Sequence, residues 1–174
     1  MIERCIMIFP DIENMDTINN LRDLYDPLAK LVRPHITLVF PFTSNITTKQ
    51  LVDHLNDTIK DISKFSLTLQ GISPHQMGGN YLFLNILHGN EMLRLLHDKL
   101  YSGILKMFYK TDIPYVPHMT IGNIEKDSEY IKAIQSTKHI DELFCTQVTK
   151  ISIETIGKLG ESIIEYEHNL LDLT

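Results

Sequence analysis

Apolar and polar residues follow two different periods along this chain. Apolar residues alternate with serine and threonine in Phe65–Leu69, the pattern of a strand with one buried face. Cys5–Phe9 and Tyr81–Leu87 are short apolar runs that also predict strands. Elsewhere leucine and isoleucine recur every three or four residues, which predicts amphipathic helices. These helical stripes run over 18–28, 51–62, 92–100 and 130–134. The chain is therefore predicted to contain both strands and helices.

The predicted elements repeat in the same order in two halves, roughly 1–75 and 80–174. Each half runs strand, helix, strand, helix, strand. The segment 73–80 contains a proline and two glycines, and it is the predicted connection between the halves. Near the end of the chain, 148–156 and 162–166 predict a hairpin. The repeat predicts one domain, 1–174, made of two lobes about a pseudo-two-fold axis.

Two short segments share a motif that the periodicity alone does not require. Pro34–Leu38 reads Pro-His-Ile-Thr-Leu, and Pro117–Ile121 reads Pro-His-Met-Thr-Ile. Residues i and i+2 of a strand project from the same face. His35 and Thr37 therefore share one face, as do His118 and Thr120, and the apolar residues point to the core. A single strand histidine means little, but its repetition about half a chain apart favours a function.

Charge and composition narrow the range of possible functions. The chain has 174 residues and a net charge of −6, which argues against a long basic groove for duplex DNA. It does not exclude a small anionic ligand or an RNA end. No apolar run approaches the roughly 20 residues of a membrane span, and the first residues do not resemble a secretory signal. We therefore expect a cytoplasmic protein with no membrane partner. Its oligomeric state cannot be inferred from the sequence.

On its two motifs, the chain resembles the two-histidine (2H) phosphoesterase superfamily, which includes 2′-5′ RNA ligase-like proteins and cyclic phosphodiesterases. The family signature is His-apolar-Thr/Ser-apolar in two copies, matched by residues 35–38 and 118–121. The run Tyr25-Asp26-Pro27 and the segment 34–42 add to the likeness. The resemblance implies a bilobal α+β fold, with two antiparallel sheets flanked by helices and both motifs facing a central cleft. It also implies metal-independent hydrolysis, or reversible ligation, of 2′,3′-cyclic or 2′-5′ phosphodiester bonds in nucleotides or RNA ends.

Cleavage of a cyclic phosphodiester requires one proton to leave the attacking water and another to reach the departing oxygen. Two histidines with a pKa near the usual value of about 6.5 can do both at neutral pH. The hydroxyls of Thr37 and Thr120 can donate hydrogen bonds to the phosphoryl oxygens. We expect His118 to be the base and His35 the acid, an order that the sequence leaves open. No spacing typical of a metal site is present, and we expect neither a metal nor a cofactor.

Further residues are candidates for substrate binding. Some family members carry a basic residue just after the second motif, where this chain has Gly122 and Asn123. Arg4, Arg33 or Lys158 could supply positive charge instead, although each could equally be a solvated surface residue. Tyr115 could stack on a base or ribose, or be a core aromatic. The other six histidines are expected at the surface: His54, His75, His88, His97, His139 and His168.

An alternative function is a non-catalytic nucleotide- or RNA-binding module on the same fold. Binding alone does not require two proton-transfer groups, so the intact histidines and threonines at all four motif positions favour an enzyme. The sequence does not determine the physiological substrate, the base preference, which bond is cleaved, or whether ligation occurs.

Overall fold

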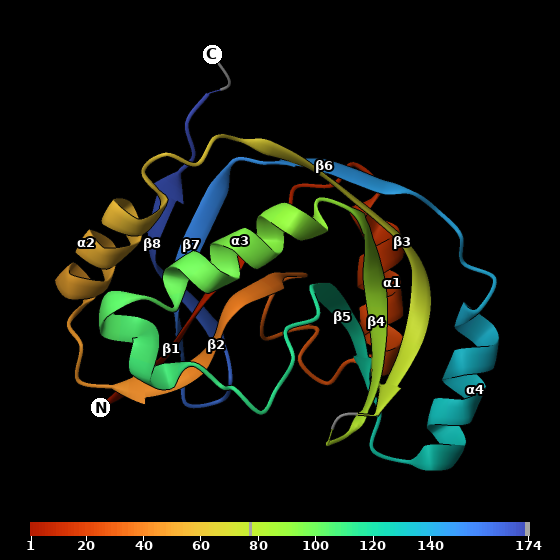
Figure 1. Ribbon diagram of the computed structural model, residues 1–174. Coiled ribbons are helices and arrows are strands. Elements are labelled where there is room, and N and C mark those ends of the chain that lie inside the picture. The colour runs from red at the N-terminus through yellow and green to blue at the C-terminus, as the bar shows by residue number, and fades with distance from the viewer. Residues whose placement is uncertain (77, 173–174) are drawn as a thin grey trace.

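The computed structural model describes residues 1–76 and 78–172, which form two four-stranded antiparallel sheets (Figure 1). The first sheet has the strand order β2-β1-β7-β8, with β2 at Ile36–Ser44, β1 at Ile2–Ile8, β7 at Lys150–Ile156 and β8 at Ser162–Asn169. The second has the order β5-β4-β3-β6, with β5 at His118–Asn123, β4 at Asn80–His88, β3 at Phe65–Gln76 and β6 at Phe144–Val148. The predicted two-sheet α+β fold is confirmed.

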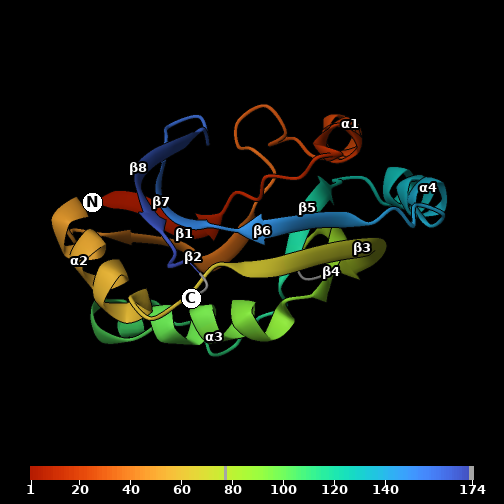
Figure 2. The ribbon, with the colours of Figure 1, turned by 90° about the horizontal axis from the view of Figure 1, so that it is seen from above.

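The helices are α1 (Met15–Tyr25), α2 (Thr48–Ile59), α3 (Asn90–Leu100), α4 (Asp127–Thr137) and the short 3-10 helix η1 (Gly103–Phe108). Two of them, α1 and α3, pack across the boundary between the two sheets. Although α1 precedes β2 in the chain, it packs on β5, and α3, which follows β4, packs on β2 and α2. Figure 2 shows α1 and α3 on opposite sides of the molecule. Within the described residues, no helix is both long and apolar enough to cross a membrane.

The two sheets do not coincide with the two halves of the chain. The predicted strand–helix order is present in each half. However, β3 pairs with β4 and β6, whereas β7 and β8 return to the first sheet. The predicted inter-lobe connection at 73–80 is therefore wrong, because residues 73–76 belong to β3 and pair with residues 80–83 of β4, residue 77 lying outside the described residues. Pro74 is tolerated there because β6 pairs only with residues 65–69 of β3, leaving an open edge beside the proline.

One hydrophobic core extends beneath both motif strands. Ile36 and Leu38 of β2 and Met119 and Ile121 of β5 have no exposed surface and belong to the same buried cluster. A slip of either strand by one residue would turn the histidine and threonine into this core and expose the apolar side chains. Burial of the alternate residues thus sets the face on which each motif displays its polar groups.

Candidate functional site

The two motifs lie on edge strands that meet between the sheets. β2 is the edge of the first sheet and β5 is the edge of the second, and Figure 1 shows them side by side at the centre of the molecule. Because β2 is an edge strand, it continues through Pro41 to Ser44 rather than ending at the proline as predicted. The side chains of His35, Thr37, His118 and Thr120 are all partly exposed, opposite the buried apolar residues of each motif.

Each motif histidine is oriented by the backbone two residues before it. His35 Nδ1 lies 2.8 Å from the Arg33 carbonyl oxygen, and His118 Nδ1 lies 2.6 Å from that of Val116. A carbonyl oxygen only accepts, so Nδ1–H is the donor in both contacts. In a neutral imidazole, Nε2 then carries the lone pair. Both rings therefore offer the same nitrogen for proton transfer.

The His118 ring is packed against an aromatic side chain of the neighbouring strand. Phe83 of β4 stacks on it with ring centroids 3.4 Å apart and an interplanar angle of 14°. Burial lowers the pKa of His118 to about 4, although the hydrogen bond to the Val116 carbonyl opposes this change. The nearby His75 and His35 lower the pKa further. His118 is thus neutral at pH 7, the state that a general base requires.

His35 has a different electrostatic environment. Burial is the main cause that lowers its pKa, while the Arg33 carbonyl raises it and Arg22 lowers it. Two carboxylates, Glu154 and Asp26, favour the protonated form of His35. Only histidines act on His118 through charge. Of the two imidazoles, His35 is the one whose neighbouring carboxylates favour a proton.

A buried arginine holds the loop that leads into the first motif. Arg22 of α1 donates to the Val32 carbonyl at 2.8 Å and pairs with Asp26 at 2.7 Å. Val32 adjoins Arg33, whose carbonyl orients His35. The ion pair therefore fixes the backbone that places the imidazole. Arg22 was not among the residues selected from the sequence, since its partner Val32 lies in a loop without a periodic pattern.

Tyr115 connects the segment before the second motif to the first motif strand. Its hydroxyl donates to the Thr37 carbonyl at 2.8 Å. Its ring stacks on His97 of α3, with centroids 3.7 Å apart and an interplanar angle of 5°. His97 itself is buried and donates from Nδ1 to the Leu38 carbonyl at 2.7 Å, so its predicted surface position is wrong. Of the two roles considered for Tyr115, these contacts favour the structural one.

The cations considered for phosphate binding lie in three different places. Arg4 is only 1% exposed and is bound to Glu165, the Ile46 carbonyl and Thr48, so neither its predicted surface position nor its role in the site fits the structure. Lys158 lies in the exposed turn between β7 and β8. Arg33 lies beside the first motif, with its guanidinium carbon 4.5 Å from the centroid of the Phe9 ring. Phe9 is in turn 6.1 Å from the His35 ring.

His75 lies near the candidate site, although the sequence suggested a surface loop. It belongs to β3 and stacks on the face of Phe83, with ring centroids 4.4 Å apart. Ser73 Oγ donates to Asn85 at 2.6 Å, so in its 3.1 Å contact with His75 Nε2 the serine oxygen accepts. The pairing of β3 with β4 brings His75 here. The phase of the alternation changes at Gly71, where β3 has a register shift, so the sequence pattern did not extend the strand to His75.

The close approach of α1 explains the small residue after the second motif. A Cβ at Gly122 would lie 3.1 Å from Tyr25 Cβ and 3.3 Å from Leu82 Cβ. Such distances are tighter than ordinary packing, so a long basic side chain would displace the helix or β4. The absence of a basic residue at Gly122 follows from the packing of α1 on β5.

An apolar hollow of about 190 Å³ opens beside His118 and Thr120. Larger hollows occur elsewhere, one of them near α1 and α4, but this one directly includes the second motif. Its other lining residues are Phe40, Tyr81, Phe83, Ile113, Pro114 and Val116. The hollow can accept a flat apolar group next to the imidazole.

Comparisons with known proteins place the chain among the two-histidine phosphoesterases, whose function is of the phosphoesterase or ligase type. Residues 9–156 match the model of the 2'-5' RNA ligase superfamily, and the chain belongs to this family. A Bacillus licheniformis protein named "Putative phosphoesterase" is 30% identical over 137 residues, covering 78% of this chain and 79% of the relative. A Geobacillus relative with the same description is 32% identical over 126 residues, covering 72% and 71%.

Solved structures share the fold at low sequence identity. Escherichia coli LigT in complex with 3'-AMP superposes with a TM-score of 0.63 and 14% identity, over 97% of this chain and 98% of LigT. TT0787 of Thermus thermophilus superposes with a TM-score of 0.67 and 12% identity, over 99% and 100%. At this identity, the likeness establishes the two-lobed architecture alone.

Proposed function

We propose that this protein cleaves, or reversibly joins, 2′,3′-cyclic or 2′-5′ phosphodiester bonds in nucleotides or RNA ends by acid–base catalysis with two histidines. The observation that carries the proposal is the shared orientation of His35 and His118. Both are held through Nδ1 and both keep Nε2 for the substrate. Two facing edge strands supply them, each with a threonine on the same face.

In hydrolysis of a cyclic phosphate, His118 Nε2 takes a proton from water as the water oxygen attacks phosphorus. The bond from phosphorus to one ribose oxygen breaks, and His35 Nε2 donates a proton to that oxygen. The product is a phosphomonoester with a free neighbouring hydroxyl. Thr37 and Thr120 donate hydrogen bonds to the remaining phosphoryl oxygens, where negative charge must be stabilised. The reverse reaction exchanges the roles of the histidines.

Burial lowers the pKa of both imidazoles, and the carboxylates near them favour this order of roles. His118 has a pKa lowered to about 4 and is ready to accept a proton at neutral pH. His35 has Glu154 and Asp26 to favour its protonated form. The dianionic character that develops on the phosphate adds to their effect on His35 once substrate is bound.

The hollow beside His118 is the proposed place for the base of the nucleotide. Its aromatic and aliphatic lining, with Tyr81 and Phe40 among its members, suits a flat ring better than a charged group. The solved LigT complex holds 3'-AMP, which agrees with a nucleotide ligand for this family. Arg33 is the proposed contact for phosphate charge at the opposite side of the histidine pair.

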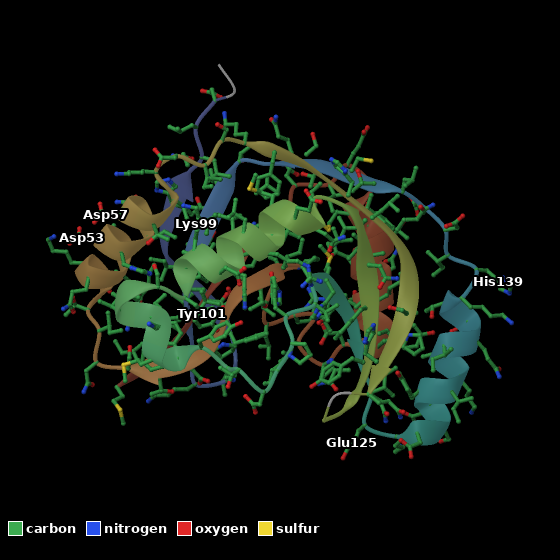
Figure 3. All side chains as sticks on the ribbon, viewed as in Figure 1. Asp53, Asp57, Lys99, Tyr101, Glu125 and His139 are labelled. Atoms are coloured by element: carbon green, nitrogen blue, oxygen red, sulfur yellow. The ribbon has the colours of Figure 1, made fainter. Side chains whose placement is uncertain are left out.

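The proposal is tested by following 2′,3′-cyclic AMP with phosphorus NMR in the presence of EDTA. We expect the cyclic phosphate signal to convert to that of a monoester. His35→Gln and His118→Gln should each lower kcat by about 10²–10⁴-fold, the usual value of one positioned proton transfer. His139→Gln is the matched control, because His139 is exposed on the segment just after α4 (Figure 3).

Two results would contradict the proposal. If folded wild-type protein turned over neither a cyclic mononucleotide nor an oligonucleotide with a cyclic or 2′-5′ phosphodiester, a nucleotide-binding module would replace the enzyme. If His35→Gln and His118→Gln kept the wild-type rate, the proton-transfer assignment would fail even though the activity was present.

A further inference from the structure

One carboxylate near the candidate site is buried without a cation beside it. Glu154 of β7 is only 3% exposed, and burial of a charge is costly unless other groups compensate for it. Within residues 1–76 and 78–172, Glu154 forms no salt bridge. The buried cation of the same sheet, Arg4, pairs instead with Glu165. Arg4 also projects to the opposite face, since the residue opposite Glu154 in the register is Cys5, the next residue of β1.

Hydrogen bonds from two neighbouring strands hold the Glu154 carboxylate. Cys5 Sγ of β1 donates to Oε1 at 3.2 Å, and Ser162 Oγ of β8 donates to Oε2. Both oxygens therefore accept, which is the pattern of an ionised carboxylate, because a protonated carboxyl would donate from one of them. Burial and the charge of Glu154 raise the pKa of the Cys5 thiol, so Cys5 keeps its proton and stays a donor.

Strand pairing places Glu154 on the face of the sheet that carries the first motif. Met7 of β1 lies opposite Thr37 on one side and opposite Ser152 on the other. Glu154 is two residues after Ser152, and His35 is two residues before Thr37. Because residues two apart in a strand share a face, the carboxylate and the imidazole project to the same side of the sheet.

The space around the carboxylate is apolar. Cys5 and Met7 form a small buried cluster there, separate from the main core, with Val32 and Phe9 packed against them. Charges in such an interior act on one another more strongly than charges in water do. The one cation at the border of the cluster, Arg33, has its guanidinium over the Phe9 ring, 4.5 Å from the ring centroid. The negative charge can therefore act on an imidazole that it does not touch.

The other charges that face His35 largely oppose one another. Burial is the main cause that lowers the pKa of His35. Arg22 of α1 and Asp26 after it pair at 2.7 Å, and they change this pKa in opposite directions. His118, from β5, is neutral at pH 7 because its own pKa is about 4. Glu154 is thus the carboxylate that acts on His35 without a paired cation to oppose it.

From this arrangement we infer that Glu154 is a positioning residue, whose buried charge favours the proton that His35 donates to the leaving oxygen. Cys5 and Ser162 hold the carboxylate in place. Glu154 touches neither the substrate nor the reacting atoms, and it acts only through the imidazole. This inference rests on the proposed function and adds to it a residue outside both motifs.

Glu154→Gln tests the inference, because it keeps the size of the side chain and removes its charge. In proton NMR titrations of the free protein, the midpoint of His35 should move to lower pH, whereas that of His118 should move much less. With 2′,3′-cyclic AMP at pH 7, kcat should fall by about three- to tenfold, because less of His35 is protonated. The basic limb of the pH–rate profile should move to lower pH for the same reason.

Glu154→Asp keeps the charge and should restore most of the wild-type midpoint and rate. It is also the second variant if the glutamine variant does not fold. Glu167→Gln is the matched control, because Glu167 lies opposite Ser152 in the same sheet but is exposed and pairs with Lys150 at the surface. It should keep both the His35 midpoint and the wild-type rate.

An unchanged His35 midpoint in folded Glu154→Gln would overturn the inference. Equal losses of kcat in Glu154→Gln and Glu154→Asp would also overturn it, because the charge would then not be the cause. A shifted midpoint in a protein that turns over no phosphodiester would support the coupling of Glu154 to His35 and count against the proposed function instead.

Discussion

At the scale of single residues, the site depends on two histidines that are held by the same type of hydrogen bond but have different surroundings. Each imidazole donates from Nδ1 to a carbonyl two residues earlier, so the same local geometry fixes both tautomers. The surroundings then separate the two rings. Phe83 and His75 lie on the His118 side, whereas Glu154 and Asp26 act on His35. Burial lowers the pKa of both imidazoles, and the charged groups that differ around them lie outside both motifs.

The lowered pKa of His118 predicts a component of acid sensitivity. Its pKa is about 4 in the folded protein and 6.5 as the ordinary value, so the unfolded chain binds more protons between these limits. The stabilising effect of a neutral His118 is present above pH 6.5 and is lost as the pH falls towards 4. His118→Gln should therefore lose less stability between pH 7 and pH 5 than wild-type protein does.

Urea unfolding at the two pH values measures this difference. His139→Gln should follow the wild-type curve, since His139 is exposed. Parallel losses of stability in His118→Gln and wild type would show that protonation of His118 does not contribute.

At the scale of elements, the free edge of β2 is held by side chains instead of another strand. Tyr115 and His97 donate to the carbonyls of Thr37 and Leu38, and Tyr101 accepts from the Phe40 amide at 2.9 Å. Figure 3 labels Tyr101, which lies between α3 and β2. These contacts satisfy backbone groups at an edge that could otherwise pair with another chain. They also tie the loop before the second motif to the first.

Tyr115→Phe should lower the free energy of unfolding by about 1 kcal/mol, because it removes the hydrogen bond to the Thr37 carbonyl. It should also lower kcat/KM, since that bond joins the two motif segments. Tyr109→Phe is the matched control at an exposed tyrosine of the same loop. Chemical denaturation and steady-state kinetics measure the two effects. Equal stability of the two variants would remove Tyr115 from the set of contacts that hold the edge.

At the scale of the whole molecule, the two lobes are interleaved. The chain crosses from the first sheet to the second before β3 and returns after β6, and α1 and α3 each pack on the sheet of the other half. Gly122 is a local part of this arrangement, because the absence of a side chain lets α1 pack closely against β5. Such crossing connections predict that the lobes unfold together, as expected for one domain over 1–174.

Substitution of Arg4 tests this cooperativity. Arg4→Met breaks the buried contact with Glu165 in the first lobe and should destabilise the protein by about 3 kcal/mol. Amide hydrogen exchange should then accelerate in β4 as much as in β7. Lys49→Met, at an exposed ion pair with Asp53, should change neither. Faster exchange in β7 with unchanged protection in β4 would mean that the lobes unfold independently.

The sequence by itself determined what depends on local periodicity. Alternation of Ile36 and Leu38 with His35 and Thr37 sets the polar face of the first motif, because strand geometry has a period of two and one face is buried. The same reasoning applies around His118. The order of the elements follows from the same patterns, whereas the two antiparallel sheets were expected from the family resemblance.

Only the tertiary structure decided which distant segments meet. The sequence predicts Arg4 to be a surface cation. In the structure, β8 places Glu165, 161 positions away, beside it. The sequence predicts His75 to lie in a loop, but the pairing of β3 with β4 places it in a strand. The sequence pattern around Ser152 predicts only a strand, and the structure shows a cavity beside it. Strand pairing and burial depend on the whole packed chain, and no short stretch of sequence encodes them. For that reason, the residues that surround the two motifs could be identified only from the fold.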